Sequence, residues 1–272
     1  MKSGKRVIIT LSSDFEKQSQ GVGNMEGVIY GINPLAKVIH LMHGMDGFDV
    51  TSAARALETV SFMPVGLHVC VVDPGVGTDR KGLIVKTKRG DYLIGPDNGC
   101  LMTAPRFLGG VESITEIANS KYMINPVSTI FHGRHLFAPA AAHLSLGVKV
   151  SEFGPKVDIN DCVDAPYKEA TVQKDRIEAT VIHVNSFGSI HLNILQSEWD
   201  KLDLALDEKI TLELGKKNLR VPFVTTFADV ALGHHLILKD DCGRIQVSFN
   251  QGNFAKQLRI KQGQKIIVKK RD

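Results

Sequence analysis

A catalytic site could be formed by Asp73, Arg80 and His132. Asp73 directly follows the apolar segment 67–72, Arg80 ends the turn after it, and His132 begins another predicted helix. Ligands of open α/β sheets bind outside the carboxyl ends of the strands, so these side chains are expected at one edge of a sheet. A carboxylate, a guanidinium and an imidazole at such an edge favour a site for a small polar reactant.

Activation of water is a reaction that these residues could carry out only as a group. A carboxylate has a pKa of about 4 and water one of about 15.7, so Asp73 alone would be a feeble base. Arg80 and His132 would have to stabilise the developing hydroxide and take up proton density. For each residue taken alone the alternative is structural: Asp73 caps the turn, Arg80 pairs with it on the surface, and His132 caps a helix start.

Asp14 and two phenylalanines could bind a nucleoside. Asp14 follows the predicted strand at residues 6–11 and could accept two hydrogen bonds from a ribose diol. An ordinary helix N-cap is the alternative for this residue. Phe48 and Phe187 could stack on a base or a sugar, although an isolated phenylalanine more often lies in the core.

Predicted strands and helices alternate in the first half of the chain, where most of these residues lie. Strands are predicted at residues 6–11, 37–42 and 67–72, helices at 22–32 and 49–62, and a hairpin at 82–94. Strands that alternate with helices are typical of a parallel sheet. The sequence therefore predicts an N-terminal α/β domain, residues 1–165, with a mainly parallel sheet.

The pattern changes after the polar, proline-bearing segment 154–167. Short alternating strands separated by glycine turns follow, at residues 179–184, 209–214, 236–239, 244–250 and 265–269. We expect residues 166–272 to form a small all-β barrel domain.

Composition limits the class of protein. Hydrophobic residues make up 43% of the chain and charged residues 23%, as in an ordinary soluble globular protein. No apolar run approaches the roughly 18 residues of a membrane span, and no signal peptide is evident, so a cytoplasmic protein without membrane contact is expected. The basic segment 256–271 lacks aromatic residues for base stacking, so nucleic-acid binding is not expected. The spacing of the cysteines and histidines predicts neither a disulfide framework nor a metal site.

Several sequence blocks together resemble one known family. They are VVDPGVGTDR at 71–80, GPDNG at 95–99, TIFHGRHLFAPAAAHL at 129–144, FG followed by LNI at 187–194, and NQGNFAKQL at 250–258. In this order they resemble the S-adenosyl-L-methionine (SAM) hydroxide adenosyltransferases, SAM hydrolases that share a fold with the bacterial fluorinase and chlorinase. The resemblance implies a homotrimer without a cofactor, with SAM as substrate between the first domain of one subunit and the second domain of its neighbour.

The resemblance also implies roles for individual residues. Asp73, Arg80 and His132 match the set that activates water, which the halogenases lack, so cleavage at C5′ to adenosine and L-methionine is expected. The matching substrate-binding positions are Asp14 at the ribose, Phe48 beside the sugar, Phe187 and Phe227 flanking adenine, and Asn250 and Gln251 at the base edge.

The methionine end departs from the family pattern. Ser19 and Asn185 stand where the family has aspartates, Ser189 replaces an asparagine, and the turn at Asp241 replaces two serines. An aspartate at 241 would repel a carboxylate, and losing the acid at 185 weakens the hold on an ammonium group. Compensation by neighbouring residues, a hydrolase with altered tail specificity, and a non-catalytic adenosyl-ligand binding protein all remain open; halogenase activity is disfavoured by the water-activating residues.

Overall fold

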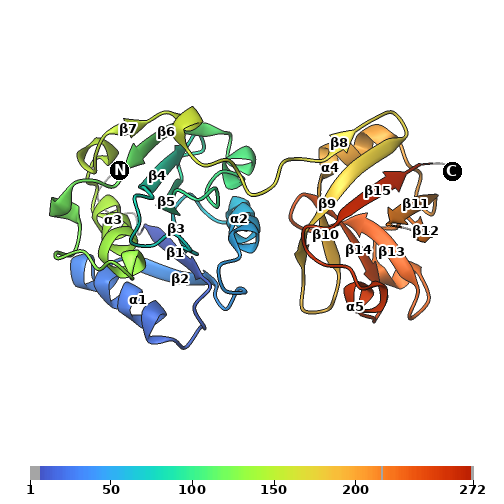
Figure 1. The fold of residues 1–272 in the computed structure, drawn as a ribbon, viewed down its shortest axis with the longest axis horizontal. Coiled ribbons are helices and arrows are strands. Elements are labelled where there is room, and N and C mark those ends of the chain that lie inside the picture. The colour runs from blue at the N-terminus through green and yellow to red at the C-terminus, as the bar shows by residue number, and fades with distance from the viewer. Residues whose placement is uncertain (1–6, 216, 271–272) are drawn as a thin grey trace. The chain divides into compact units, whose positions relative to one another are not determined.

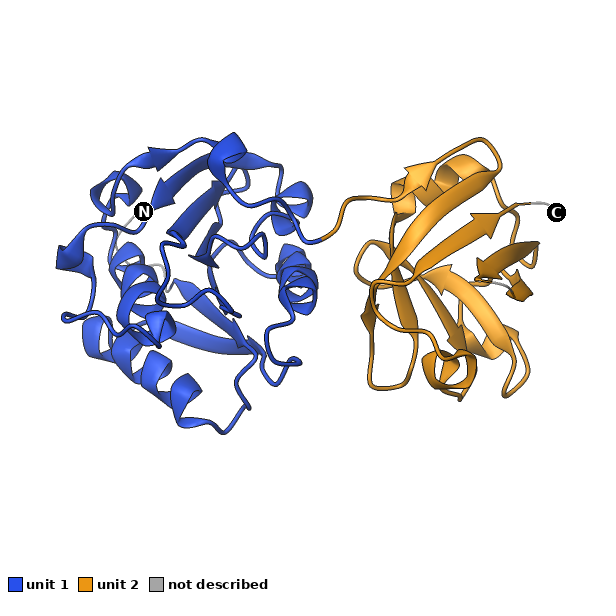
Figure 2. Ribbon diagram, viewed as in Figure 1, with its two compact units in different colours: residues 1–166 blue, residues 167–272 orange. Residues whose placement is uncertain are grey.

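A seven-stranded mixed sheet organises the first of two units in the computed structural model, which describes residues 7–215 and 217–270. The units are Met1–Pro166 and Tyr167–Asp272 (Figure 2). The strands of the first sheet are β1 (Ile8–Ser13), β2 (Lys37–Met42), β3 (Leu67–Val71), β4 (Gly82–Thr87), β5 (Tyr92–Pro96), β6 (Val111–Glu116) and β7 (Lys156–Val157), in the order β2-β1-β3-β5-β4-β6-β7.

Neighbouring strands of this sheet are parallel on one side and antiparallel on the other. β2, β1, β3 and β5 run parallel, as the alternating strands and helices predicted. β4 pairs antiparallel with β5, β6 with β4, and β7 with β6, because the chain reverses through hairpins and longer returns there. The expected mainly parallel sheet is therefore a mixed one, which keeps its parallel strands around β3.

Helices cover both faces of the first sheet (Figure 1). α1 (Gln20–Ile32) and α3 (Ala138–Ser145) contribute to one core cluster, and α2 (Val50–Glu58) to the other. Val69 and Val71 of β3 contact the first cluster and Cys70 the second, because successive side chains of a strand point to opposite faces. All of β3 is buried, which explains its continuous apolar sequence.

The second unit is an antiparallel sheet that nearly closes into a barrel. Its strands are β8 (Thr171–Val172), β9 (Arg176–Val184), β10 (Ile190–Leu195), β11 (Lys209–Leu214), β12 (Lys217–Pro222), β13 (His235–Lys239), β14 (Arg244–Phe249) and β15 (Lys265–Lys269). The order is β12-β11-β15-β9-β10-β14-β13, with β8 beside β9. A bridge between Phe223 and Ile237 links the two ends of this path. Short helices α4 (Gln196–Trp199) and α5 (Phe254–Leu258) bury Trp199 and Phe254 against the sheet.

The sequence patterns identified most of the longer elements but missed the strands β6, β7, β8, β10 and β12 and the short helices α4 and α5. Among the described residues, no helix is both long and apolar enough to cross a membrane.

Candidate active site

The carboxyl edge of the parallel strands carries the acids of the first unit. Ser13 at the end of β1 lies opposite Val71 at the end of β3. Asp14 and Asp73 therefore leave neighbouring strands at the same edge, as the strand pattern predicted. Both acids line a hollow of about 170 Å³, together with Phe48 and His132.

Arg80 joins the predicted catalytic residues into one contact group. Its Nη2 donates to Oδ2 of Asp73 in a very short ion pair, and lies 2.7 Å from Nδ1 of His132. The side chains of Arg80 and Asp73 are only 8% and 7% exposed, which excludes the alternative of a surface pair. The guanidinium also stacks over the Phe137 ring, with its carbon 5.5 Å from the ring centroid.

A tight turn and a glycine bring the catalytic residues together. The N–H of Val76 donates to the carbonyl of Asp73, 3.2 Å away, so the chain turns directly after the acid. Gly77 has a φ of +79°, and a Cβ there would lie 2.2 Å from the carbonyl oxygen of Thr129. Only glycine allows the turn to approach the segment that leads to His132 this closely. His132 precedes the π-helical turn Gly133–Phe137 and makes no side-chain cap to it, so the helix-cap alternative is wrong.

Burial and charge shift the pKa values of this group in opposite directions. Burial raises the pKa of Asp73, outweighing the lowering effect of Arg80. Burial, followed by the charge of Arg80, lowers the pKa of His132, so the imidazole is neutral at pH 7. Arginine only donates hydrogen bonds; Nδ1 of His132 therefore accepts, and Nε2 carries the ring hydrogen. Oδ1 of Asp73 and Nε of Arg80 are buried without a hydrogen-bond partner among the described residues.

Asp14 is held by the loop that carries Phe48. The backbone N–H of Phe48 donates to Oδ2 of Asp14 at 3.0 Å, and Phe48 adopts a left-handed φ of 67°. The N-cap of α1 is Ser19, whose hydroxyl accepts from the N–H of Val22, so Asp14 is not a helix cap. The Phe48 side chain is 72% exposed, which excludes the core alternative.

A hydrogen-bonded chain beneath this loop was not anticipated from sequence. Oγ of Ser13 lies 2.7 Å from Nδ1 of His43, and Nε2 of His43 lies 2.9 Å from Nδ1 of His40. Burial, then the charges of His40 and Lys17, lowers the pKa of His43 to about 4. His40 in turn lies 3.3 Å from Glu26. The chain anchors the start of the loop that ends at Phe48, and no sequence spacing signals it.

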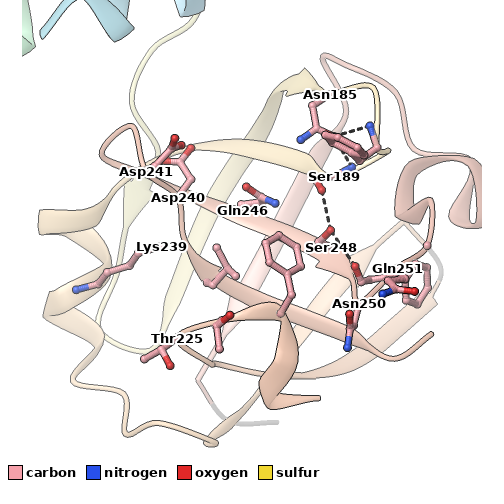
Figure 3. A pocket seen from close by; sticks show the side chains of 16 residues that line it. Asn185, Ser189, Thr225, Lys239, Asp240, Asp241, Gln246, Ser248, Asn250 and Gln251 are labelled. Atoms are coloured by element: carbon pink, nitrogen blue, oxygen red, sulfur yellow. Dashed lines mark hydrogen bonds between the residues drawn. The ribbon is translucent and has the colours of Figure 1, made fainter. Parts of the chain in front are cut away.

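The second unit contains the larger hollow, of about 900 Å³ (Figure 3). All the substrate-binding residues predicted after residue 166 line it, namely Asn185, Phe187, Ser189, Phe227, Asp241, Asn250 and Gln251. Phe187 is 79% exposed, so it is not a core residue. The predicted residues thus form two groups, one in each unit.

The floor of the second hollow adds residues that the sequence had not singled out. Gln246 and Ser248 of β14 line it, because residues two apart on a strand share a face, and Asn250, which follows the strand, lines it as well. Oγ of Ser248 lies 2.7 Å from Oγ of Ser189, which directly precedes the neighbouring strand β10. The alternation of polar and apolar residues from 246 to 250 was the available signal.

Comparison with known proteins decides the family. The family models described as the SAM hydroxide adenosyltransferase N-terminal and C-terminal domains match residues 9–154 and 179–267. The chain belongs to the SAM hydroxide adenosyltransferase family. It is 33% identical to the (R)-S-adenosyl-L-methionine hydrolase of Salinispora tropica, over 96% of this chain and 97% of the relative. The hydrolase of the same name from Methanocaldococcus jannaschii is 31% identical, over 93% and 92% of the two chains.

More distant and structural relatives agree with this family. The fluorinase of Nocardia brasiliensis is 22% identical over 98% of each chain. The crystal structure of an uncharacterized conserved protein from Thermotoga maritima superposes with a TM-score of 0.89 at 31% identity, covering 96% of this chain and 99% of that one.

Two of the residues that differ from the family pattern at the methionine end have structural roles. Ser19 caps α1, as described above. Asn185 accepts hydrogen bonds at its Oδ1 from the N–H groups of Phe187 and Ser189, at 3.1 and 3.0 Å, and so shapes the turn before β10. An aspartate would make the same bonds, so the turn explains an oxygen at this position but not the loss of the charge.

Proposed function

We propose that this chain hydrolyses S-adenosyl-L-methionine to adenosine and L-methionine, using a water activated by Asp73, Arg80 and His132. The observation that carries the proposal is the contact group around Arg80, in which Asp73 keeps one buried oxygen without a partner. Relatives named as hydrolases of this substrate, similar over nearly their whole length, support the same reaction.

The reaction displaces a neutral thioether by water. The water oxygen forms a bond to C5′ as the C5′–S bond breaks, and the bonding electron pair goes to sulfur. One water proton passes to Oδ1 of Asp73 and then to solvent, so the sulfonium charge leaves as a released proton. Arg80 stabilises the charge that develops on the oxygen, and the neutral His132 holds Arg80 through Nδ1. The gain from such a fixed arrangement is largely one of orientation.

Substrate binding is assigned to residues of both hollows. The free oxygen of Asp14 would accept from the ribose diol, with Phe48 beside the sugar. Phe187 and Phe227 would flank adenine, with Asn250 and Gln251 at the base edge. A homotrimer that shares its sites between the first domain of one subunit and the second of its neighbour, with residues 1–165 and 166–272 as the domains, accounts for the two separate groups. Sedimentation velocity tests the trimer. We place the enzyme in the cytoplasm and propose that it needs no cofactor.

The sulfonium sulfur of the substrate is a stereocentre, so the substrate has two epimers. The relatives are named for the (R) form of the substrate. We propose that this chain also prefers the (R) epimer.

The test is to incubate the pure protein with each sulfur epimer and to follow adenosine by chromatography. We expect adenosine from wild type, faster with the (R) epimer, and none above background from Asp73→Asn. Asp79→Asn is the matched control, since Asp79 is an exposed acid in the same turn. Ligand binding by wild type without any adenosine would instead favour a non-catalytic binding protein.

A further inference from the structure

Gln246 is a buried amide that faces the hollow of the second unit without a partner. The residue is only 7% exposed, and it lines the hollow from β14. Within residues 7–215 and 217–270 its side chain makes no hydrogen bond, whereas Ser248 beside it pairs with Ser189 (Figure 3). Buried polar side chains nearly always have partners, so an amide left open toward a hollow points to a group on a ligand.

The charged residues beside Gln246 indicate which group of a ligand would bind there. Figure 3 shows Gln246 between Ser248 and the acidic pair Asp240 and Asp241. The carboxylate of Asp240 already has hydrogen-bond partners. Its Oδ2 lies 2.9 Å from Nδ1 of His191, and its Oδ1 accepts from the backbone N–H groups of Cys242 and Arg244. Asp241 is exposed and accepts only from the thiol of Cys242 among the contacts of the described chain. One carboxylate at this end of the hollow is therefore available to a ligand.

The cation that lines the same end is already neutralised. Nζ of Lys239 lies 2.6 Å from Oδ1 of Asp200, outside the hollow. This end of the hollow thus offers hydrogen-bond acceptors and a negative charge, but no unpaired lysine or arginine among its described lining residues. Such a surface favours an ammonium group and gives a carboxylate no ion pair.

The hollow also suits a flat ring. Phe187, Phe249 and Asn250 line it, and Figure 3 shows Asn250 and Asp241 on opposite sides of Ser248. Asn250 follows β14 four residues after Gln246, and four residues of extended chain span about 13 Å, which separates a base from the amino-acid end of one ligand.

We propose that Asp241 and Gln246 bind the ammonium group of the substrate's tail, and that the tail carboxylate is dispensable. The inference rests on the proposed function and names its substrate class: adenosyl sulfoniums whose tail carries an ammonium group, with or without a carboxylate. Oδ of Asp241 and Oε1 of Gln246 accept from the ammonium. The free Nε2 of Gln246 remains for a neutral acceptor or water.

Steady-state kinetics with three sulfoniums test this assignment. They are S-adenosylmethionine, the analogue with a 3-aminopropyl tail that lacks the carboxylate, and the analogue that keeps the carboxylate and lacks the amine. Wild type is expected to turn over the aminopropyl compound at least as efficiently as S-adenosylmethionine, and the amine-free compound least efficiently. Asp241→Asn is expected to raise KM about tenfold for both amine-bearing compounds with little change in kcat.

Gln246 is tested by a pair of variants. Gln246→Leu is expected to raise the same KM values, while Gln246→Glu keeps an acceptor, adds a charge and lowers them. Glu198→Gln is the matched control, because Glu198 pairs with Lys201 and does not line the hollow. Thermal unfolding of each variant separates a folding defect from a binding defect.

The outcomes separate this inference from the proposed function. Adenosine from wild type, with KM values unmoved in Asp241→Asn and Gln246→Glu, overturns the inference alone. A KM for the aminopropyl compound tenfold above that for S-adenosylmethionine also overturns it. If wild type forms adenosine from none of the compounds, the proposed function fails, and calorimetric binding of the aminopropyl compound to wild type and Asp241→Asn then decides the inference.

Discussion

The two hollows differ in how their polar groups are satisfied. In the first unit, Asp73, Arg80 and His132 hold one another beside a small hollow, and Oδ1 of Asp73 and Nε of Arg80 are buried there without partners among the described residues. In the second unit the hollow is larger, Phe187 and Phe227 at its lining are exposed, and Gln246 and Asp241 have spare hydrogen-bonding capacity. We therefore expect the first arrangement to be preorganised for a reaction and the second to hold a ligand.

The largest loss of kcat is expected when the side chain at position 80 changes its shape but keeps its charge. Arg80→Lys retains the cation but cannot contact Asp73 and His132 with one planar group. We expect kcat to fall by about a hundredfold or more, on the scale of losing one oriented electrostatic group. Binding of adenosine, measured by calorimetry, should change little, because the residues that we propose to contact the base line the other hollow. Equal losses in both measurements would contradict the division of labour between the hollows.

As the pH falls, protonation of Asp73 should impair the first hollow before the second is affected. Asp73 must be ionised to accept a proton from water, and its pKa is raised by burial. Activity should therefore fall tenfold per unit of pH once the pH drops below that raised pKa, above the range of an ordinary aspartate near 4. His132 adds no break near pH 6.5, because its pKa is lowered. A kcat profile from pH 4 to 8 checks this; an acid limb that begins only below pH 4 would argue against Asp73 as the base.

A smaller effect is expected from removing an aromatic ring of the second hollow. Phe187→Ala should raise KM about tenfold, since stacking of a base on an aromatic ring contributes about 1–3 kcal/mol. The melting temperature should not fall, because the side chain is 79% exposed. Phe62→Ala is the matched control, since Phe62 is 70% exposed and lines neither of these hollows. A large loss of kcat with unchanged KM would assign Phe187 to the reaction instead.

The smallest effect concerns the buried hydroxyl pair beneath the second hollow. Ser248→Ala removes one partner of the 2.7 Å contact with Ser189. The free energy of unfolding should fall by about 1 kcal/mol, the usual net value of one hydrogen bond, with kcat unchanged. Urea unfolding measures it. The double variant with Ser189→Ala should cost less than the sum of the two single variants, because it leaves no hydroxyl unpaired.

Local patterns in the sequence predicted those elements whose burial is regular. The strand at 37–42 and the hairpin of β4 and β5 are as expected. β10 was missed because it buries His191 and Asn193 along with its apolar residues, and their partners lie far away in the chain. β12 was missed because it is a mostly exposed, polar strand at the end of the sheet.

Site contacts within one turn could be predicted from the sequence, whereas site contacts between distant segments could not. Asp73 and Arg80 lie in one turn, so their contact follows from local sequence, whereas the contact with His132 needed the family resemblance or the fold. Gln246 and the Ser13–His43 contact escaped because each is defined by what surrounds it in space. The order of strands in the mixed sheet was equally beyond local patterns.

The turn at Asn185 allows asparagine and aspartate to exchange during evolution. Its two hydrogen bonds use only Oδ1, an atom that asparagine and aspartate share. Exchange between these amino acids therefore leaves the backbone intact while it changes the net charge at the rim of the hollow. Ligand preference at this position can drift by a single substitution without a loss of foldability, which also makes it a safe first position for redesign.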